Sequence, residues 1–397
     1  MNKVTDISVS QDSFVSLHVQ LHNQLRHLIL SGRWPNGSRI PSETTLATSL
    51  NISRSTVRQA LQHAEIEGLI ERFSGRGSFV AHSAKAGHQR RLIAFVTHRF
   101  DSDTLLLILK GAEAEARMRG YQIILNTVQN QQEEIAVLRR LKSENVVGIL
   151  IWADAAASKP HAQNPLNYGA ADLPMVAIDR QIYGIDCDFV TSDHYTGTEA
   201  LMQHLVELGH RHIAFLSHQQ GHLFSVRERY RAYSDVLERH GLTPATPWVV
   251  GDTDSEVGAT DALRSSVGVK SAILDQIHHF MLAASPCPTA VVSLHDYLAI
   301  MAMQAMKKTN SLVPDIVSIT GFDDIDLASY LEVPLTTVAQ DHFSLGKQAA
   351  RLLFDRLEGF VGPSVREVIS TELRIRHSTA AAVSAEGGDA YRKEPAR

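Results

Sequence analysis

The sequence predicts an α/β protein made of two parts: a small winged helix-turn-helix, followed by a larger domain of parallel sheets in two lobes. Residues 1–80 contain helical segments joined by a very short turn, then a hairpin with a basic, glycine-rich tip. From residue 91, short apolar strands alternate with amphipathic helices, which is typical of parallel sheets with right-handed crossovers. This alternation is too long for one sheet and therefore predicts two lobes.

Length and composition narrow the class of protein. The chain has 397 residues, 44% of them hydrophobic and 20% charged, with a net charge of -5, as expected for a soluble globular protein with more than one domain. No apolar run reaches the ~18 residues of a membrane span, and the N-terminus lacks a signal-peptide core. Cys187 and Cys287 have no ligand-like spacing. We expect a cytoplasmic protein with free thiols.

Changes in composition give the expected domain boundaries. Residues 82–90 are polar and small, as in a linker, and residues 378–397 are small and charged, as in a disordered tail. The expected order is a flexible N-terminus over 1–13, the winged helix-turn-helix over 14–81, the linker over 82–90, the two-lobed domain over 91–377 and the disordered tail over 378–397.

Three helices are expected before the hairpin. Residues 17–30 form an amphipathic helix, because leucines recur on one face. The next helix starts at Ser42, whose hydroxyl can accept from the free N–H groups of the first turn. Asn51 lies in the turn that follows. Ser53 caps the third helix and Gly68 ends it.

The third helix separates an apolar face from a polar one. The apolar face is made by Val57, Ala60, Leu61 and Ala64. The opposite face begins with Arg54, Ser55, Thr56 and Arg58. Two helices joined by so short a turn, with donors at the start of the second, suit a recognition helix in a DNA major groove.

Residues 69–73 and 78–80 are expected to pair as a hairpin around Ser74-Gly75-Arg76-Gly77, because the glycines permit φ > 0. An arginine on such a tip can lie along a narrow groove or a line of phosphates. A solvated helix with idle arginines would explain each charge separately. It would not explain the cap, the buried face and the basic tip together, so the pattern predicts DNA binding.

The segment 14–81 resembles the winged helix-turn-helix of GntR-type bacterial transcription regulators. The resemblance rests on LxxQLRHLILSGRWPNGSRIPSE, ISRSTVRQALQHAEIEGLIER and GRGSFV. It implies that Arg54 and Arg58 read base edges and that Ser55 and Thr56 hold phosphates. It also implies that Gly75, Arg76 and Gly77 form the wing and that Ser42 and Thr44, at the start of the preceding helix, belong to the DNA-binding surface. Family members commonly carry an arginine where Thr44 stands, which leaves the usual base preference open.

The expected elements of the larger domain alternate along the chain. Strands are expected over residues 92–97, 121–126, 146–151, 175–178, 189–191, 212–216, 290–293, 316–320, 335–338 and 365–375. Helices are expected over residues 104–119, 131–142, 194–208, 226–240, 256–282, 297–308 and 342–357.

Polar side chains follow the ends of many of these strands, where open α/β sheets bind ligands. They are Asp101, Asp103, Asp179, Arg180, Arg227, His295, Asp296 and Gln340. The aromatic residues near them are Phe100, Tyr183, Phe224 and Tyr297. Carboxylates and arginines that chelate vicinal hydroxyls, with aromatic faces against a ring, form a sugar site. Each residue alone is explained as a surface charge or a cap, but their shared position favours a site.

The segment 91–377 resembles the effector-binding domain of LacI-type repressors, which are related to periplasmic sugar-binding proteins. The matching stretches include GAEAEARMRGYQIIL, LPMVAIDR, HLVELGHRHIAFL, VPDIVSITGFDDIDLASYLEVPLTTVAQ and LGKQAARLLFDRLEG. The resemblance implies a hinge-closing fold with crossovers near 192, 340 and 363, and dimer contacts on the first lobe. The implied effector contacts are Phe100, Asp101, Asp179, Arg180, Arg227, Asp296 and Gln340.

This chain departs from the LacI-type pattern at three places. His98-Arg99-Phe100-Asp101 replaces the usual Asn-Pro-aromatic, His295 replaces an Asn, and Ser192-Asp193-His194 replaces Val-Asp-Asn. These changes leave the ligand open. A GntR-like reader joined to a LacI-like sensor resembles the plan of AraR-type arabinose repressors, so a pentose is the leading expectation and a nucleoside an alternative.

Other functions have weaker support. The twenty histidines raise the question of a metal site, but no HExxH motif and no acidic or cysteine partner at ligand spacing is present. An enzyme would need a nucleophile elbow or a phosphate-binding glycine loop, and neither is found. Asp323 and Asp324 are interpreted as loop capping. We expect no cofactor, no metal, no catalytic residues and no membrane partner.

Two hypotheses remain. One is a homodimeric transcription regulator, expected to be a repressor, that binds operator DNA and is modulated by a small sugar. The other is a plain sugar-binding protein, which the winged helix and the missing secretion signal disfavour.

Overall fold

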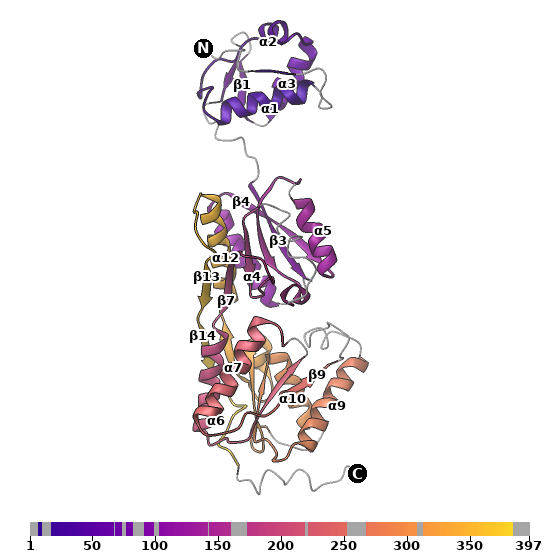
Figure 1. The fold of residues 1–397 in the computed structure, drawn as a ribbon, viewed down its shortest axis with the longest axis vertical. Coiled ribbons are helices and arrows are strands. Elements are labelled where there is room, and N and C mark those ends of the chain that lie inside the picture. Colours follow the sequence, from indigo (N-terminus) through magenta and orange to yellow (C-terminus); the bar gives the residue numbers. More distant parts are fainter. Residues whose placement is uncertain are drawn as a thin grey trace. The chain divides into compact units, whose positions relative to one another are not determined.

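The computed structural model of the chain describes residues 7–9, 17–66, 68–73, 77–81, 91–98, 103–141, 143–159, 173–218, 221–251, 267–307 and 313–383. Two compact units are present, residues 1–91 and residues 92–397. Figure 1 shows the helices and strands of both units. No helix in the described ranges combines the length and the apolar character needed to cross a bilayer.

The first unit is the predicted winged helix-turn-helix. Its elements are α1 (Leu17–Leu30), α2 (Glu43–Leu50), α3 (Arg54–Ile66), β1 (Ile70–Phe73) and β2 (Gly77–Val80). β1 and β2 are antiparallel, with Ile70 opposite Val80. The three helices and the hairpin enclose a small apolar core that contains Leu21, Leu25, Trp34, Leu46, Val57, Leu61 and Leu69. Ile7 is also buried in this core, so the N-terminal residues expected to be flexible are packed at this position.

The first lobe of the larger unit is built on a six-stranded sheet with the order β13-β7-β6-β5-β3-β4. The strands are β3 (Arg91–His98), β4 (Tyr121–Val128), β5 (Val146–Trp152), β6 (Met175–Ile178), β7 (Asp188–Ser192) and β13 (Arg366–Ile369). The helices are α4 (Asp103–Met118), α5 (Gln131–Leu141) and α12 (His342–Leu357), with a short 3-10 turn η2 (Ala155–Ser158). α4 and α12 pack together and share one apolar cluster with the sheet.

The second lobe has a six-stranded sheet with the order β14-β12-β11-β10-β8-β9. The strands are β8 (Ile213–His218), β9 (Trp248–Val250), β10 (Ala290–Ser293), β11 (Ser318–Asp323), β12 (Thr336–Gln340) and β14 (Thr371–Arg374). The helices are α6 (His194–Glu207), α7 (Phe224–Arg239), α9 (Val267–Ala283), α10 (Asp296–Lys307) and α11 (Asp326–Tyr330). β14 is antiparallel to β12, whereas β8 to β12 are mutually parallel.

The chain passes between the lobes three times. The first two passages, at Asp193 between β7 and α6 and at Asp341 between β12 and α12, lie where they were predicted. The third was predicted near residue 363 and is wrong. β13 still pairs with β7 of the first lobe, and β14 pairs with β12 of the second, so the chain crosses at Ser370. The single predicted strand over residues 365–375 is therefore two strands in two sheets.

Two further expectations differ from the structure. The disordered tail was expected to begin at residue 378, but Ser378 is fully buried and accepts from the Thr336 amide at 2.8 Å while donating to the Ile319 carbonyl. The Ala382 amide donates to the Leu208 carbonyl, so the chain is ordered through this segment. β9 and α11 were not predicted because they are so short. The start of the helix expected over 256–282, up to residue 266, lies outside the described residues.

The contact between α4 and α12 requires glycine on both helices. A Cβ added at Gly111 would lie 1.9 Å from the Phe343 carbonyl oxygen, and one added at Gly346 would lie 1.9 Å from the Ile108 carbonyl oxygen. Because backbone atoms are the obstacle, a larger residue forces the helices apart rather than moving a side chain.

We predict that Gly346→Ala lowers the free energy of unfolding of the larger unit by about 2 kcal/mol or more, the upper range of overpacking costs. Gly221→Ala is the matched control, since nothing lies within 4 Å of its Cβ position. Urea unfolding of both variants measures the difference. Equal stability of the two variants would contradict the assigned helix contact.

Candidate functional site

The first unit presents a polar helix start on its surface. Ser53 caps α3, because its hydroxyl accepts from the Thr56 amide at 3.1 Å. The same hydroxyl bonds those of Ser55, at 2.7 Å, and Thr56, at 2.8 Å. Arg54 and Ser55 are exposed and Thr56 is half-buried. These donors stand at the positive end of the helix dipole, where phosphate oxygens are favoured.

Ion pairs fix the start of α3 against its neighbours. The Arg58 guanidinium lies 3.4 Å from the Glu43 carboxylate at the start of α2, and Arg72 of the hairpin lies 3.6 Å from the same carboxylate. Arg72 also approaches Glu65 at 3.2 Å. The Arg58 side chain remains 62% exposed, so it can turn from Glu43 to a nucleic acid.

Of the other predicted DNA-binding residues, three lie in the described part of the chain and two do not. Ser42 caps α2 by accepting from the Thr45 amide, and Thr44 is exposed on the same helix. Gly77 begins β2 with φ 101°, which a residue with a Cβ rarely adopts. Gly75 and Arg76, the predicted tip of the wing, lie outside the described residues.

The larger unit gathers charged and polar side chains where its two lobes meet. Asp179 follows β6 of the first lobe. His194 starts α6, Arg229 lies in the second turn of α7, Asp323 ends β11 and Gln340 ends β12, all in the second lobe or at its border. Arg229 and His194 are buried, and the side chains of Asp179 and Asp323 are about 21% and 20% exposed. We call these five residues the interlobe cluster.

Hydrogen bonds and one longer ion pair link the residues of the interlobe cluster across the lobes. Arg229 donates to His194 Nδ1 from Nε at 3.4 Å and from a terminal nitrogen at 3.3 Å. Because Nδ1 accepts, the proton of neutral His194 is on Nε2, which lies 3.1 Å from Asp179 Oδ1. The same terminal nitrogen of Arg229 lies 3.8 Å from Asp323, which accepts from Gln340 at 2.7 Å.

Packing holds Arg229 in place between these partners. Its guanidinium lies 3.7 Å from the centroid of the Phe322 ring, and it donates to the Leu294 carbonyl. The His194 ring lies 5.8 Å from the same phenylalanine ring. The arginine is therefore fixed in orientation, although its bonds to His194 are long for hydrogen bonds.

The charges of the interlobe cluster follow from its burial. Burial would raise the pKa of Asp179, but the hydrogen bond from His194 and the charges of Arg229 and Arg180 outweigh it and lower the pKa to about 2. Burial, and then the charge of Arg229, lower the pKa of His194, so this imidazole is neutral. Burial raises the pKa of Asp323 to about 6, against the opposing charge of Arg229.

Unpartnered polar atoms lie on neighbouring strand ends of the second lobe. His218 is the last residue of β8 and His295 lies two residues after β10, with ring centroids 5.4 Å apart. Nδ1 of His218 and Nε2 of His295 have no hydrogen-bond partner within the described part of the chain. Burial lowers the pKa of both rings, that of His218 to about 4. Two neutral imidazoles with open nitrogens offer bonds to a ligand.

The remaining predicted effector contacts divide into three groups. Arg180 lies at the strand end of the first lobe, donates to the Ala153 carbonyl at 3.1 Å and stands 5.7 Å from the Trp152 ring. Asp296 is fully buried behind the interlobe cluster and accepts from Thr337 and from the Ile325 amide, so its oxygens are used within the lobe. Phe100 and Asp101 lie outside the described residues.

Three residues of the interlobe cluster, His194, Arg229 and Asp323, were not predicted as effector contacts from the sequence. Arg227 was expected in the pocket, but it is exposed and takes no part in the cluster, whose arginine is Arg229. The buried stripe of α7 includes Val226, Arg229, Tyr233 and Leu237, so helical spacing was the missed signal. Asp323 was interpreted as a loop cap. It follows the same strand-end rule as the other candidates, whereas Asp324 pairs with Arg376 at 2.6 Å.

No group of three or more histidine, cysteine, aspartate or glutamate side chains in the described ranges is arranged to hold a metal ion. Cys187 and Cys287 are free thiols. His210 bonds Thr289 and Ser318 through its two ring nitrogens, which accounts for it as a structural residue.

Comparison with known families divides the chain in the same way as the structure. Residues 17–80 match "Bacterial regulatory proteins, gntR family", and residues 202–379 match "Periplasmic binding protein-like domain". The chain thus joins a GntR-type winged helix-turn-helix to a LacI-type, periplasmic-binding-protein-like domain.

Two similar proteins match this chain over nearly their full length. The arabinose metabolism transcriptional repressor of Geobacillus stearothermophilus is 29% identical over 91% of this chain and 97% of its own. The repressor of the same name from Halalkalibacterium halodurans is 26% identical over 92% and 96%. A LacI family transcriptional regulator from Mycobacterium smegmatis has the fold of the larger unit, with a TM-score of 0.60, 24% identity, and coverage of 73% of this chain and 100% of its own.

We predict that Asp179→Asn destabilises the larger unit by roughly 2 kcal/mol at pH 7, the free energy that corresponds to the lowered pKa. The ionised carboxylate stabilises the fold above its unfolded pKa near 4. That contribution is lost as pH falls towards 2, so the gap between variant and wild type narrows over this range. Urea unfolding at pH 7 and at pH 3 tests this.

Asp315→Asn, at an exposed position, is the control and is expected to match wild type at both pH values. A destabilisation by Asp179→Asn that is the same at pH 7 and pH 3 would show that shape, rather than charge, connects Asp179 to His194.

Proposed function

We propose that this protein is a homodimeric transcription regulator, acting as a repressor, whose winged helix-turn-helix binds operator DNA and whose larger unit binds a small neutral sugar between its lobes. The observation that carries the proposal is the interlobe cluster, a buried arginine and carboxylates at the facing strand ends, in a chain that begins with a DNA-binding fold.

The proposed reader is the start of α3. Arg54 and Arg58 are exposed there, next to the hydroxyls of Ser55 and Thr56. Arginines reach base edges in the major groove, and hydroxyls at a helix N-terminus hold phosphates. Glu43 competes for Arg58 in the free protein, so operator binding exchanges one anionic partner for another.

The proposed effector is a neutral polyol. Arg229 and Asp323 can bind vicinal hydroxyls as donor and acceptor, and the open nitrogens of His218 and His295 lie at the ends of β8 and β10 in the same sheet as Asp323. Asp179 and Asp323 already offset the charge of Arg229, which disfavours an anionic effector in this place. The names of the relatives favour arabinose among the pentoses.

The contacts within the interlobe cluster supply a route from the proposed sugar site to the lobe geometry. A hydroxyl that bonds Arg229 or Asp323 changes how Arg229 holds His194, and His194 is the residue that contacts Asp179 of the other lobe. The effector can shift the lobes only by its differential affinity for two states, typically ~1–3 kcal/mol. In the proposed dimer this shift changes the spacing of the two readers, and DNA is released.

A cytoplasmic location follows from the proposed role on DNA. The proposal assigns no catalytic residue, metal or cofactor. A nucleoside is the alternative effector, and the aromatic faces of Phe224 and Phe322 beside His194 would suit its base. A gel shift on DNA upstream of the gene, with and without a panel of pentoses, hexoses and nucleosides, tests the proposal. Saturable binding that a pentose weakens supports it, and absence of binding at low salt overturns it.

We predict that Arg229→Lys weakens sugar binding at least about tenfold, because lysine keeps the charge but loses the planar fork. Operator affinity without sugar should stay within about twofold, since the charge of the interlobe cluster is preserved. Calorimetry with the sugar and fluorescence anisotropy with operator DNA measure the two affinities.

Arg227→Ala is the comparison variant on the same helix and is expected to bind the sugar as wild type does, because Arg227 lies outside the interlobe cluster. If Arg227→Ala loses sugar binding while Arg229→Lys retains it, the proposed pocket is misplaced.

We predict that Arg58→Ala costs about 1–3 kcal/mol of operator binding and relaxes the preference at one base pair. Thr56→Ala should weaken binding to all operator variants alike, because a phosphate contact carries no sequence information. Gln62→Ala, exposed in the later turns of α3, is the control. Unequal losses of Thr56→Ala across operator variants would contradict its role.

A further inference from the structure

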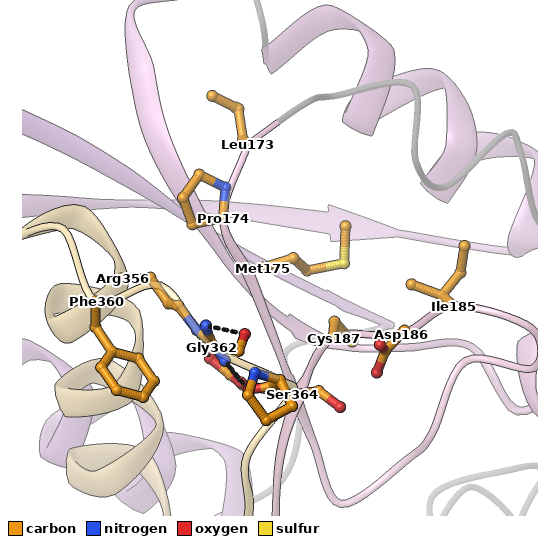
Figure 2. Close-up of a pocket in the computed structure, with 12 residues that line it drawn as sticks. Leu173, Pro174, Met175, Ile185, Asp186, Cys187, Arg356, Phe360, Gly362 and Ser364 are labelled. Atoms are coloured by element: carbon orange, nitrogen blue, oxygen red, sulfur yellow. Dashed lines mark hydrogen bonds and ion pairs between the residues drawn. The ribbon is translucent and has the colours of Figure 1, made fainter.

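Two neighbouring hollows on the larger unit are separate from the interlobe cluster, none of whose residues lines them. Figure 2 shows the first, of about 440 Å³, with Leu173, Pro174 and Met175 on one wall and Arg356 and Phe360 on the other. The second, of about 560 Å³, shares several lining residues with the first. The shared residues are Ile185, Asp186, Cys187 and Ser364.

The arginine of the first hollow has a structural role. Arg356 binds both carboxylate oxygens of Asp188, at 2.6 and 2.8 Å, and donates to the carbonyls of Gly362 and Pro363. Dashed lines in Figure 2 mark such bonds. The Asp188 carboxylate balances its charge and the two carbonyls occupy further N–H donors, so this guanidinium is poorly suited to bind a ligand.

The arginines of the second hollow are placed differently. Arg227, in the first turn of α7, and Arg366, at the start of β13, both line it and are exposed. The Arg366 guanidinium lies 4.4 Å from the centroid of the Phe224 ring and 5.8 Å from that of Phe189, so aromatic faces position it. Neither arginine forms an ion pair with a carboxylate in the described ranges, in contrast to Arg356.

The helix that carries Arg227 adds to the positive potential. α7 has 16 residues, and its N-cap position, Leu223, provides no side-chain hydrogen bond to the first turn. The free N–H groups of that turn and the positive end of the dipole are next to Phe224 and Arg227, which line the hollow. Two unpaired guanidinium groups and a helix start on one hollow favour an anion.

We propose that this second hollow is a separate ligand site for a small phosphate monoester that also carries hydroxyl groups. The phosphate would take the forks of Arg227 and Arg366, which match its geometry. Asp186 lines the same hollow and would accept from hydroxyls of the ligand, and Tyr183 and Ser364 supply further polar groups. The volume is within the range of small-molecule sites.

Such a ligand would contact both lobes. Phe224 and Arg227 come from α7 of the second lobe, whereas Arg366, Ser364 and residues 181–187 come from the first. An anion held by Arg227 and Arg366 together fixes one lobe against the other. The site therefore supplies a second input to the lobe equilibrium, chemically distinct from the neutral sugar of the interlobe cluster.

The test is thermal unfolding of the full chain at constant ionic strength with inorganic phosphate, glycerol 3-phosphate, acetate or chloride. We expect saturable stabilisation by phosphate and stronger stabilisation by the ester. Arg227→Gln or Arg366→Gln should each weaken the apparent affinity at least about tenfold, as for a lost charge-assisted hydrogen bond, and the double variant should abolish it.

Arg231→Gln is the matched control on the same helix, because Arg231 pairs with Glu228 and stacks on Tyr195 outside the hollow. Ser364→Asp adds a carboxylate at the rim without changing either arginine, and it should also abolish the effect. A response of the double variant equal to that of wild type overturns the proposal, as does the absence of saturable stabilisation by any phosphate. Stabilisation by acetate alone would instead assign the site to carboxylates and overturn the phosphate assignment.

Discussion

The interlobe cluster depends on one buried arginine of the second lobe, Arg229, which reaches the first lobe through His194 and Asp179. Arg229 is held by the neutral ring of His194, by the face of Phe322 and by the Leu294 carbonyl. Among the described residues, its nearest carboxylate is that of Asp323, at 3.8 Å, which is too long for a hydrogen bond. A buried cation held by weak partners is costly unless something stronger can replace them. In the proposed mechanism, a hydroxyl of the bound sugar replaces one of these weak partners.

His194 connects Arg229 to the first lobe. It stands one residue after the first crossover, and it reaches Asp179 with one ring nitrogen while accepting from Arg229 with the other. In the proposed mechanism, the histidine couples the sugar site to the position of the first lobe, and its Nδ1 accepts from Arg229 only while the ring is neutral.

Much of the fold follows from patterns that the sequence displays openly, such as the cap at Ser53, the leucine stripe of α1 and the alternation of strands and helices. The crossover at Ser370 could not be read in this way, since two strands that continue one another have the same pattern as one long strand. The site was only partly predictable. Strand-end position indicated Asp179 and Gln340. Choosing between Arg227 and Arg229 required knowing which residues of α7 face the interior. The ordered position of Ser378 depends on partners far away in the sequence, such as Thr336.

The central claim is that a neutral sugar bound at Arg229 controls operator affinity. The most direct measurement is fluorescence anisotropy of the full chain on its upstream DNA, with and without arabinose, for wild type and Arg229→Lys. The account predicts that the sugar weakens operator binding by wild type about 5- to 150-fold and leaves the variant, which binds the same DNA, unchanged. An equal response of both proteins would contradict it.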